Sequence, residues 1–142
     1  MSAFKIIGIV KYRYNNDPST DTFNMVVEDG RIEVVNAIAG DPANMPQYIA
    51  VGSDGTGETS TDSELGSELD RKPASISKNT TSIDFDVIFY PGEATGDIRE
   101  VGLLSDDVGG TLFARTTITD RIKGPNDRLD ITWTIMVVDA SS

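Results

Sequence analysis

Strict alternation of apolar and polar residues is the feature of this sequence that most limits its fold. The pattern covers residues 82–89 and returns in residues 130–137, with Trp133 at its centre. Successive side chains of a β-strand point to opposite faces, so a period of two predicts strands that bury one face only. The sequence therefore predicts half-buried strands whose apolar faces must be covered by another layer.

Further segments rich in β-branched and aromatic residues predict strands over residues 48–51, 98–104 and 112–118. Turn signals separate the last two, because Ser and Asp residues end one strand and a pair of glycines leads into the next. This regular spacing favours a mainly β fold, a β-sandwich or barrel-like domain of about seven or eight strands.

Two segments carry helical signals. Residues 29–39 have apolar residues at helical spacing and are followed by Gly40, a typical helix stop. Residues 62–69 place Leu65 and Leu69 at i and i+4, behind an aspartate suited to an N-cap. We therefore expect one or two short helices beside the strands.

The first strand differs from the others because it is apolar on both faces. One face carries Phe4, Ile6 and Val10 followed by two tyrosines, and the other carries Ile7 and Ile9. A strand with two apolar faces must be covered on both. It is either a central strand of the sandwich or a strand contributed to the sheet or interface of a neighbouring subunit.

These alternatives define the expected organisation of the chain. We expect residues 1–27 to form an N-terminal strand or hairpin with a contact between subunits, and residues 28–142 to form the β-sandwich domain. The residues expected at an interface between copies are Phe4, Ile6, Ile7, Ile9, Val10, Met136 and Val138.

The chain contains no cysteine and no histidine. Their absence excludes thiolate metal sites, disulfides and a cysteine nucleophile, and it removes imidazole from acid–base chemistry. A chain of 142 residues is long enough to bury a core without metal or disulfide. We therefore assign no catalytic, cofactor-binding or metal-ligating residues, and we do not expect an enzyme.

The formal net charge is −11, from 23 acidic and 12 basic residues. A surface this negative repels nucleic acid and anionic lipid, so neither is expected as a partner. The charge serves solubility, or it reflects a high-salt environment in which repulsion is screened. No apolar run is long enough to span a membrane, and the opening MSAFKIIGIVKYRY lacks the features of a signal peptide. We expect a protein used where it is made or inside an assembly.

The Gly-rich stretch of residues 52–59 does not match a phosphate-binding loop, because no lysine follows its last glycine. We read it as a flexible surface loop. It does not match an EF-hand either, since Thr59 stands where that motif needs glycine. An irregular Ca²⁺ site formed by Asp54 with Asp62, or by Asp106 with Asp107, stays open beside the default of solvated acidic loops.

Two other patterns are weak. Glu93, Asp97 and Glu100 lie close in the sequence, as paired glycosidase carboxylates would, but such proximity is expected by chance in a chain rich in aspartate. Asn79 begins an N-x-Ser/Thr tripeptide between two predicted strands, which is a candidate glycosylation site and also a common chance match.

Glu100 is the one carboxylate whose predicted position demands a partner. Strict alternation places it on the same side of its strand as Ile98, facing the core. Burying an unpaired charge is costly, so a cation must lie opposite it. We expect a structural ion pair that fixes register, with Arg71 or Arg115 as the partner.

Several segments occur in the order found in small structural proteins of tailed phages, the tail, tail-fibre or baseplate-associated family. A strand enters a Gly-rich loop, an acidic turn with leucines follows, and a Tyr-Pro-Gly turn leads into a strand containing Arg-Glu-Val-Gly-Leu. The segments that resemble this family are residues 48–56, 61–72, 89–103, 110–115, 122–125 and 129–135. The resemblance covers roughly residues 40–138, with residues 29–39 included, whereas the segment before Glu28 departs from the pattern.

The resemblance implies a virion component that self-associates as a ring or trimer, contacts other virion structural proteins, and has no catalytic residues. It would be assembled in the host cytoplasm and remain in the virion. The acidity suits a virus of a halophilic host, by analogy an archaeal one. Two alternatives remain: a decoration or turret protein on the capsid surface, and a receptor- or carbohydrate-binding module acting at the host surface.

Overall fold

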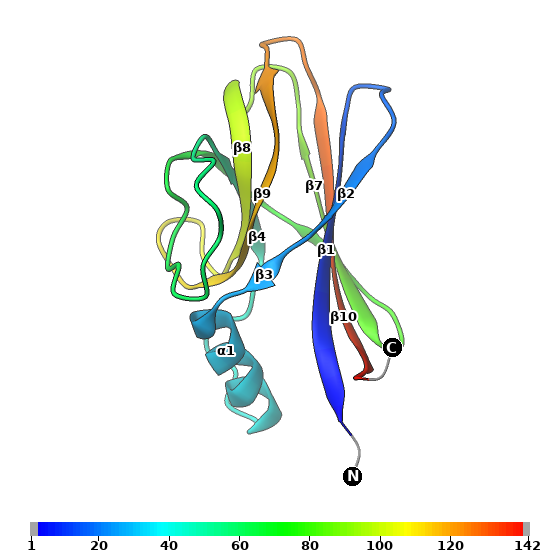
Figure 1. Ribbon diagram of the computed structural model, residues 1–142, viewed down its shortest axis with the longest axis vertical. Helices are drawn as coiled ribbons and strands as arrows, with labels where there is room; N and C mark the ends of the chain where they lie inside the picture. The colour runs from blue at the N-terminus through cyan, green and yellow to red at the C-terminus, as the bar shows by residue number, and fades with distance from the viewer. Residues whose placement is uncertain (1–2, 141–142) are drawn as a thin grey trace.

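Two antiparallel five-stranded sheets make up the protein in the computed structural model, which describes residues 3–140 (Figure 1). Sheet A has the order β2 (Thr20–Phe23), β1 (Phe4–Tyr14), β10 (Leu129–Asp139), β7 (Ser82–Phe89) and β6 (Ser75–Lys78). Sheet B has the order β3 (Met25–Val26), β9 (Leu112–Lys123), β8 (Gly96–Leu104), β4 (Tyr48–Gly52) and β5 (Glu68–Pro73). The expected mainly β, sandwich-like fold is therefore confirmed, with ten strands in the described residues.

The alternating segments supply the inner face of sheet A. Trp133 lies at the centre of β10, between Val10 of β1 and Phe85 of β7, and is fully buried. Ile98 and Leu103 of β8 meet this layer from sheet B. Each apolar side chain buried in this way contributes about 1.5–3 kcal/mol. The facing inner surfaces of the two sheets are thus the core of the protein.

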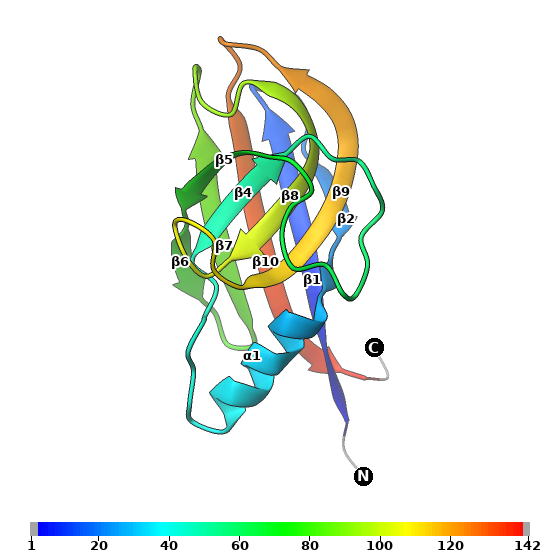
Figure 2. The ribbon, with the colours of Figure 1, turned by 90° about the vertical axis from the view of Figure 1, so that its left-hand side faces the viewer.

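The helix α1 (Glu28–Ile38) lies at one end of the sandwich, beside the start of β1 and the end of β10 (Figures 1 and 2). Glu28 and Asp29 in its first turn are favourable there, because the amino end of a helix carries partial positive charge. Gly30 allows α1 to approach sheet B closely, since a Cβ at this position would lie 2.1 Å from the carbonyl oxygen of Phe113. The helix expected over residues 29–39 is present within one residue at each end.

The second expected helix, over residues 62–69, is wrong. Leu65 is buried in a small cluster against sheet B, and Glu68 begins strand β5 instead of ending a helix. The backbone N–H groups of Gly66 and Ser67 donate to the Glu100 carboxylate at 2.9 Å. Tertiary partners therefore replace the i,i+4 bonds that a helix would have made.

The expected boundary at residue 27 has no counterpart in the fold. β1 pairs with β10 along its whole length, from Phe4 opposite Asp139 to Tyr14 opposite Leu129. The N-terminal segment is thus part of sheet A, although residues 1–2 and 141–142 of the two expected domains lie outside the described residues. Among residues 3–140, no helix is long and apolar enough to cross a membrane.

Candidate interaction surface

Large apolar side chains are exposed together at the end of the sandwich where α1 lies. Ile32, Val35 and Ile38 of α1 are 50%, 65% and 74% exposed, Phe4 at the start of β1 is 60% exposed, and Val137 near the end of β10 is 44% exposed. We call this the open end. Contiguous apolar surface on a soluble protein marks a site of contact with another molecule.

A groove of about 410 Å³ enters the sandwich at the open end, between α1 and the inner face of sheet A. Its lining is entirely apolar and comes from α1, β1, β7, β9, β10 and the loop before β4. The residues that line it are Phe4, Ile6, Val34, Ala37, Ile38, Met45, Pro46, Ile83, Phe85, Phe113, Ile135 and Val137. The core of the sandwich is therefore continuous with an apolar surface open to solvent.

Hydrogen bonds to Glu33 fix the position of α1, which forms the outer wall of this groove. Glu33 is the one charged residue of α1 that is buried, and its carboxylate accepts the N–H of Asn44 at 2.9 Å and the amide groups of Asn44 and Asn36 at 3.3 Å. The hydrogen bond from the backbone of Asn44 lowers the pKa of Glu33. These bonds fasten α1 to the loop that carries Met45 and Pro46.

One backbone crossing leaves part of β1 without a neighbour. The chain leaves sheet A after β2 and enters sheet B at β3, and Asn24 marks the crossing. The Asn24 N–H donates to the Gly8 carbonyl at 3.1 Å, and its side-chain oxygen accepts from Trp133 Nε1 at 3.0 Å. Gly8 is required here, because a Cβ would lie 1.5 Å from that oxygen.

Below this crossing, β1 has a free edge at the open end. Strand β2 pairs with β1 only from Ile9 to Tyr12, so no described strand pairs with this edge at Phe4–Ile7. The N–H and C=O of a residue in an antiparallel strand point to the same edge, and successive residues alternate. The Gly8 carbonyl points to the β2 side, so those of Phe4 and Ile6 do too. Their backbone groups face the free edge.

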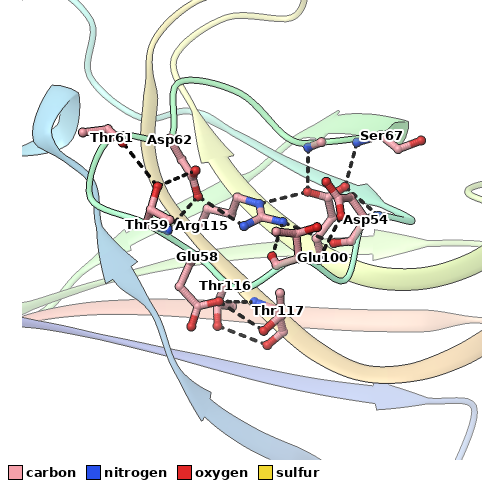
Figure 3. A network of polar contacts seen from close by, with 12 residues as sticks. Asp54, Glu58, Thr59, Thr61, Asp62, Ser67, Glu100, Arg115, Thr116 and Thr117 are labelled. Carbon is pink, nitrogen blue, oxygen red and sulfur yellow. Dashed lines mark hydrogen bonds and ion pairs between the residues drawn. The ribbon is translucent and has the colours of Figure 1, made fainter.

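A second feature is a buried ion pair on the outer face of sheet B (Figure 3). Arg115 Nε of β9 lies 3.0 Å from Glu100 Oε1 of β8, and the side chains are 3% and 0% exposed. A β-bulge between Ile98 and Glu100 turns them to opposite faces, which corrects the expectation that both face the core. Of the two arginines expected opposite Glu100, Arg115 lies there, whereas Arg71 pairs with Glu68 at 2.6 Å.

The ion pair fastens the loop between β4 and β5. Glu100 accepts the N–H of Asp54 at 2.9 Å, and the Arg115 guanidinium donates to the carbonyl oxygens of Asp54 and Thr56 at 3.2 and 2.9 Å. Glu58 accepts the N–H of Thr117 at 3.0 Å. The Gly-rich stretch is a surface loop as expected, but it is tied to sheet B along its length.

Arg115 occupies the space between the two aspartates considered for a calcium site. Its Nη1 lies 3.2 Å from Asp62 Oδ2. Burial raises the pKa of Asp62, but hydrogen bonds from Thr59 and the charge of Arg115 outweigh it, and the pKa is lowered. The pKa of Asp54 is lowered mainly by the N–H of Thr56. The guanidinium thus supplies positive charge at this place, and no group of three or more Asp or Glu in residues 3–140 is arranged to hold a metal ion.

The predicted interface residues do not lie on one surface. Phe4 and Ile6 line the groove, while Ile7 and Met136 oppose each other on the outer face of sheet A. Ile9 and Val138 are half-buried on that same outer face. Val10 is wrong as an interface residue, because its side chain points into the sandwich and is fully buried beside Trp133.

Sequence reasoning missed the exposed face of α1. Ile32, Val35 and Ile38 recur every three residues, a spacing that marks one helical stripe. That signal was available, but it could not tell whether the stripe faces the sandwich or solvent. In the structure Gly30 and Glu33 occupy the buried side of the helix instead.

Comparison with family models, with curated proteins and with solved structures found no match to this chain.

Proposed function

We propose that this chain is a structural subunit of a tailed virus particle, located in its tail, fibre or baseplate, and that it has no catalytic role. In this proposal it assembles with copies of itself and with other virion proteins, and it belongs to a virus of a halophilic host. Residues 40–138 support the location through their resemblance to small tail-associated proteins. The acidic composition supports the host, because a charge of −11 is screened in concentrated salt.

The observation that carries the proposal is the open end. Five large apolar side chains are exposed there, and three of them, Phe4, Ile38 and Val137, line a groove without polar lining. Monomeric proteins rarely leave such an apolar surface exposed to water, whereas a subunit buries it on assembly. The open end fits a capsid decoration protein equally well, so the resemblance of residues 40–138 is what favours the tail over the capsid surface and over a host-surface binding module.

Measurement of mass in solution tests the assembly. We expect oligomers in sedimentation velocity and native mass spectrometry, and we expect Val35→Asp to shift them towards monomer. Ile122→Asp is the matched control, because Ile122 is 72% exposed and lies near the end of β9 that points away from α1 (Figure 1). A strict monomer at both low and molar salt would contradict assembly with copies of itself.

Electron microscopy tests the location. Gold-labelled antibodies raised against the purified protein should decorate the tails of intact particles. Labelling over the capsid instead would support the decoration protein, and unlabelled particles would contradict a virion role.

A further inference from the structure

The free edge of β1 narrows the kind of partner that can close the open end. Phe4 and Ile6 present backbone N–H and C=O groups along this edge, and their side chains line the apolar groove. A helix or a lipid surface would cover the side chains but leave these backbone groups without partners, which is costly once water is excluded. An extended strand satisfies the backbone groups and covers the apolar side chains, because it adds hydrogen bonds and places alternate side chains over the groove.

The segment of this chain that best matches these requirements is the same half of β1. Of the described edge strands, β2 has four residues of which three are exposed, β3 has two residues, β5 ends at Pro73, and β6 is exposed throughout. The free half of β1 combines unpaired backbone groups with apolar side chains on the inner face, and Phe4 is already 60% exposed. An edge of this kind is self-complementary, because an antiparallel pair of identical strands obeys two-fold symmetry.

We propose that two copies of this protein pair antiparallel along the free edges of β1, so that sheet A continues from one copy into the other. The pairing rests on the proposed structural role and specifies its first contact. Centred on Lys5, this pairing sets Phe4 of each copy opposite Ile6 of the second copy. The N–H and C=O groups of both residues then form hydrogen bonds between the two strands. Phe4 of each copy then covers the groove beside Ile6 of the other.

The charge of the protein makes the pairing depend on salt. Each copy has a net charge of −11, so two copies repel each other. Salt shortens the screening length from about 10 Å at 0.1 M to about 3 Å at 1 M, so this repulsion fades as the apolar contacts remain. The pair is therefore a contact that concentrated salt switches on.

Disulfide trapping tests the register directly, because the chain has no cysteine of its own. Opposed residues at the centre of such a pair have Cβ atoms about 4.5–5.5 Å apart, near disulfide reach. Under mild oxidation at high salt, Lys5→Cys should form a covalent dimer. Lys11→Cys is the control, since Lys11 lies on the same strand and face but is opposed by Asp21 of β2. Equal trapping of both variants would overturn the proposed register.

A proline tests the hydrogen bonds. Ile6→Pro removes an N–H that points to the free edge and leaves the bonds between β1 and β10 in place, a position where sheets accept proline. Ile6→Ala loses most of the same side chain but keeps the N–H. We expect the dissociation constant of the dimer to be at least about tenfold higher for Ile6→Pro than for Ile6→Ala, with both variants unfolding cooperatively.

The dissociation constant of the unmodified protein should fall as NaCl rises from 0.1 M to 2 M. A dimer that salt weakens would overturn the pairing, because it would require unlike charges at the contact. Oligomers that form without trapping at Lys5→Cys and without sensitivity to Ile6→Pro would overturn strand pairing and leave self-assembly standing. A monomer under all conditions would overturn both.

Discussion

Arg115 and Glu100 form an ion pair that is almost fully withdrawn from solvent, with 3.0 Å between Nε and Oε1. The remaining capacity of the carboxylate is taken by three backbone N–H groups, those of Asp54, Gly66 and Ser67, each at 2.9 Å. A buried charge pair is stable only when its other hydrogen-bonding positions are filled, as they are here. The pair therefore joins β8, β9 and the loop between β4 and β5 into one unit.

Removing one partner of this ion pair should lower the free energy of unfolding strongly. Arg115→Met leaves the Glu100 carboxylate buried without its cation, and we expect a loss of about 3–5 kcal/mol in the free energy of unfolding. Denaturant unfolding measures this loss, and hydrogen exchange should show faster exchange at the Gly66 and Ser67 amides. Arg99→Met is the control: Arg99 makes exposed ion pairs with Asp97 and Asp120, and its loss should change the free energy of unfolding far less. Equal effects of the two substitutions would contradict the role assigned to Arg115.

The strands of this fold could be predicted where one face is apolar and the other polar. β7 and β10 were found from their alternation, because tertiary structure did not oppose the local pattern. β5 and β6 carry mainly charged and small polar residues, and Leu69 and Ile76 are too few to make an alternating apolar face, so no signal marks these strands. Residues 62–69 carry a helical signal, but the N–H groups of Gly66 and Ser67 donate to the Glu100 carboxylate instead of to a helix backbone.

The candidate surface could be predicted only in part. Phe4 and Ile6 were expected at an interface and do line the groove, because a strand apolar on both faces must be covered twice. Val10 obeyed the same pattern but lies where sheet B covers it. The free edge was beyond prediction, since it depends on Asn24 directing the chain from one sheet to the other at Gly8.

Acid should destabilise the protein in a defined range of pH. The pKa values of Asp54, Asp62 and Glu93 are lowered in the folded state, for Glu93 mainly through the hydrogen bond from Lys72. A lowered carboxyl pKa gives stability above the unfolded value that is lost as pH falls through the folded value. Asp120 opposes the trend, because hydrogen bonding with Asp97 raises its pKa.

We therefore expect the free energy of unfolding to be nearly constant from pH 7 to about pH 5 and to fall below about pH 4, near the ordinary pKa values of carboxyl groups. Urea unfolding at a series of pH values at fixed ionic strength measures it. Asp62→Asn should reduce the steepness of the fall. Stability that rises as the pH is lowered would contradict the assigned shifts.

Lys123 is buried inside the sandwich, at the end opposite α1. Its side chain is fully buried, and Nζ donates to the carbonyl oxygens of Tyr90, Glu93 and Asp127 at 3.1, 2.6 and 2.6 Å. Lys123→Met keeps the length of the side chain but removes the Nζ donor from the carbonyl oxygens of Glu93 and Asp127, whereas that of Tyr90 still accepts the Glu93 N–H, and we expect a loss of about 3 kcal/mol. Thermal and urea unfolding measure it. Lys78→Met, on the exposed edge strand β6, should be nearly neutral, and similar losses for both would remove the role given to Lys123.

The seating of α1 depends on Gly30. A Cβ here would lie 2.1 Å from the backbone oxygen of Phe113, so Gly30→Ala must push the helix away from β9. Alanine favours a helix by about 1 kcal/mol over glycine, yet overpacking costs about 1–3 kcal/mol, and we expect net destabilisation in urea unfolding. Gly57→Ala is the matched control, because no atom lies within 4 Å of its Cβ position. Since α1 forms one wall of the groove, Gly30→Ala should also weaken oligomers in sedimentation velocity while Gly57→Ala does not, and an unchanged oligomer in both variants would separate α1 from assembly.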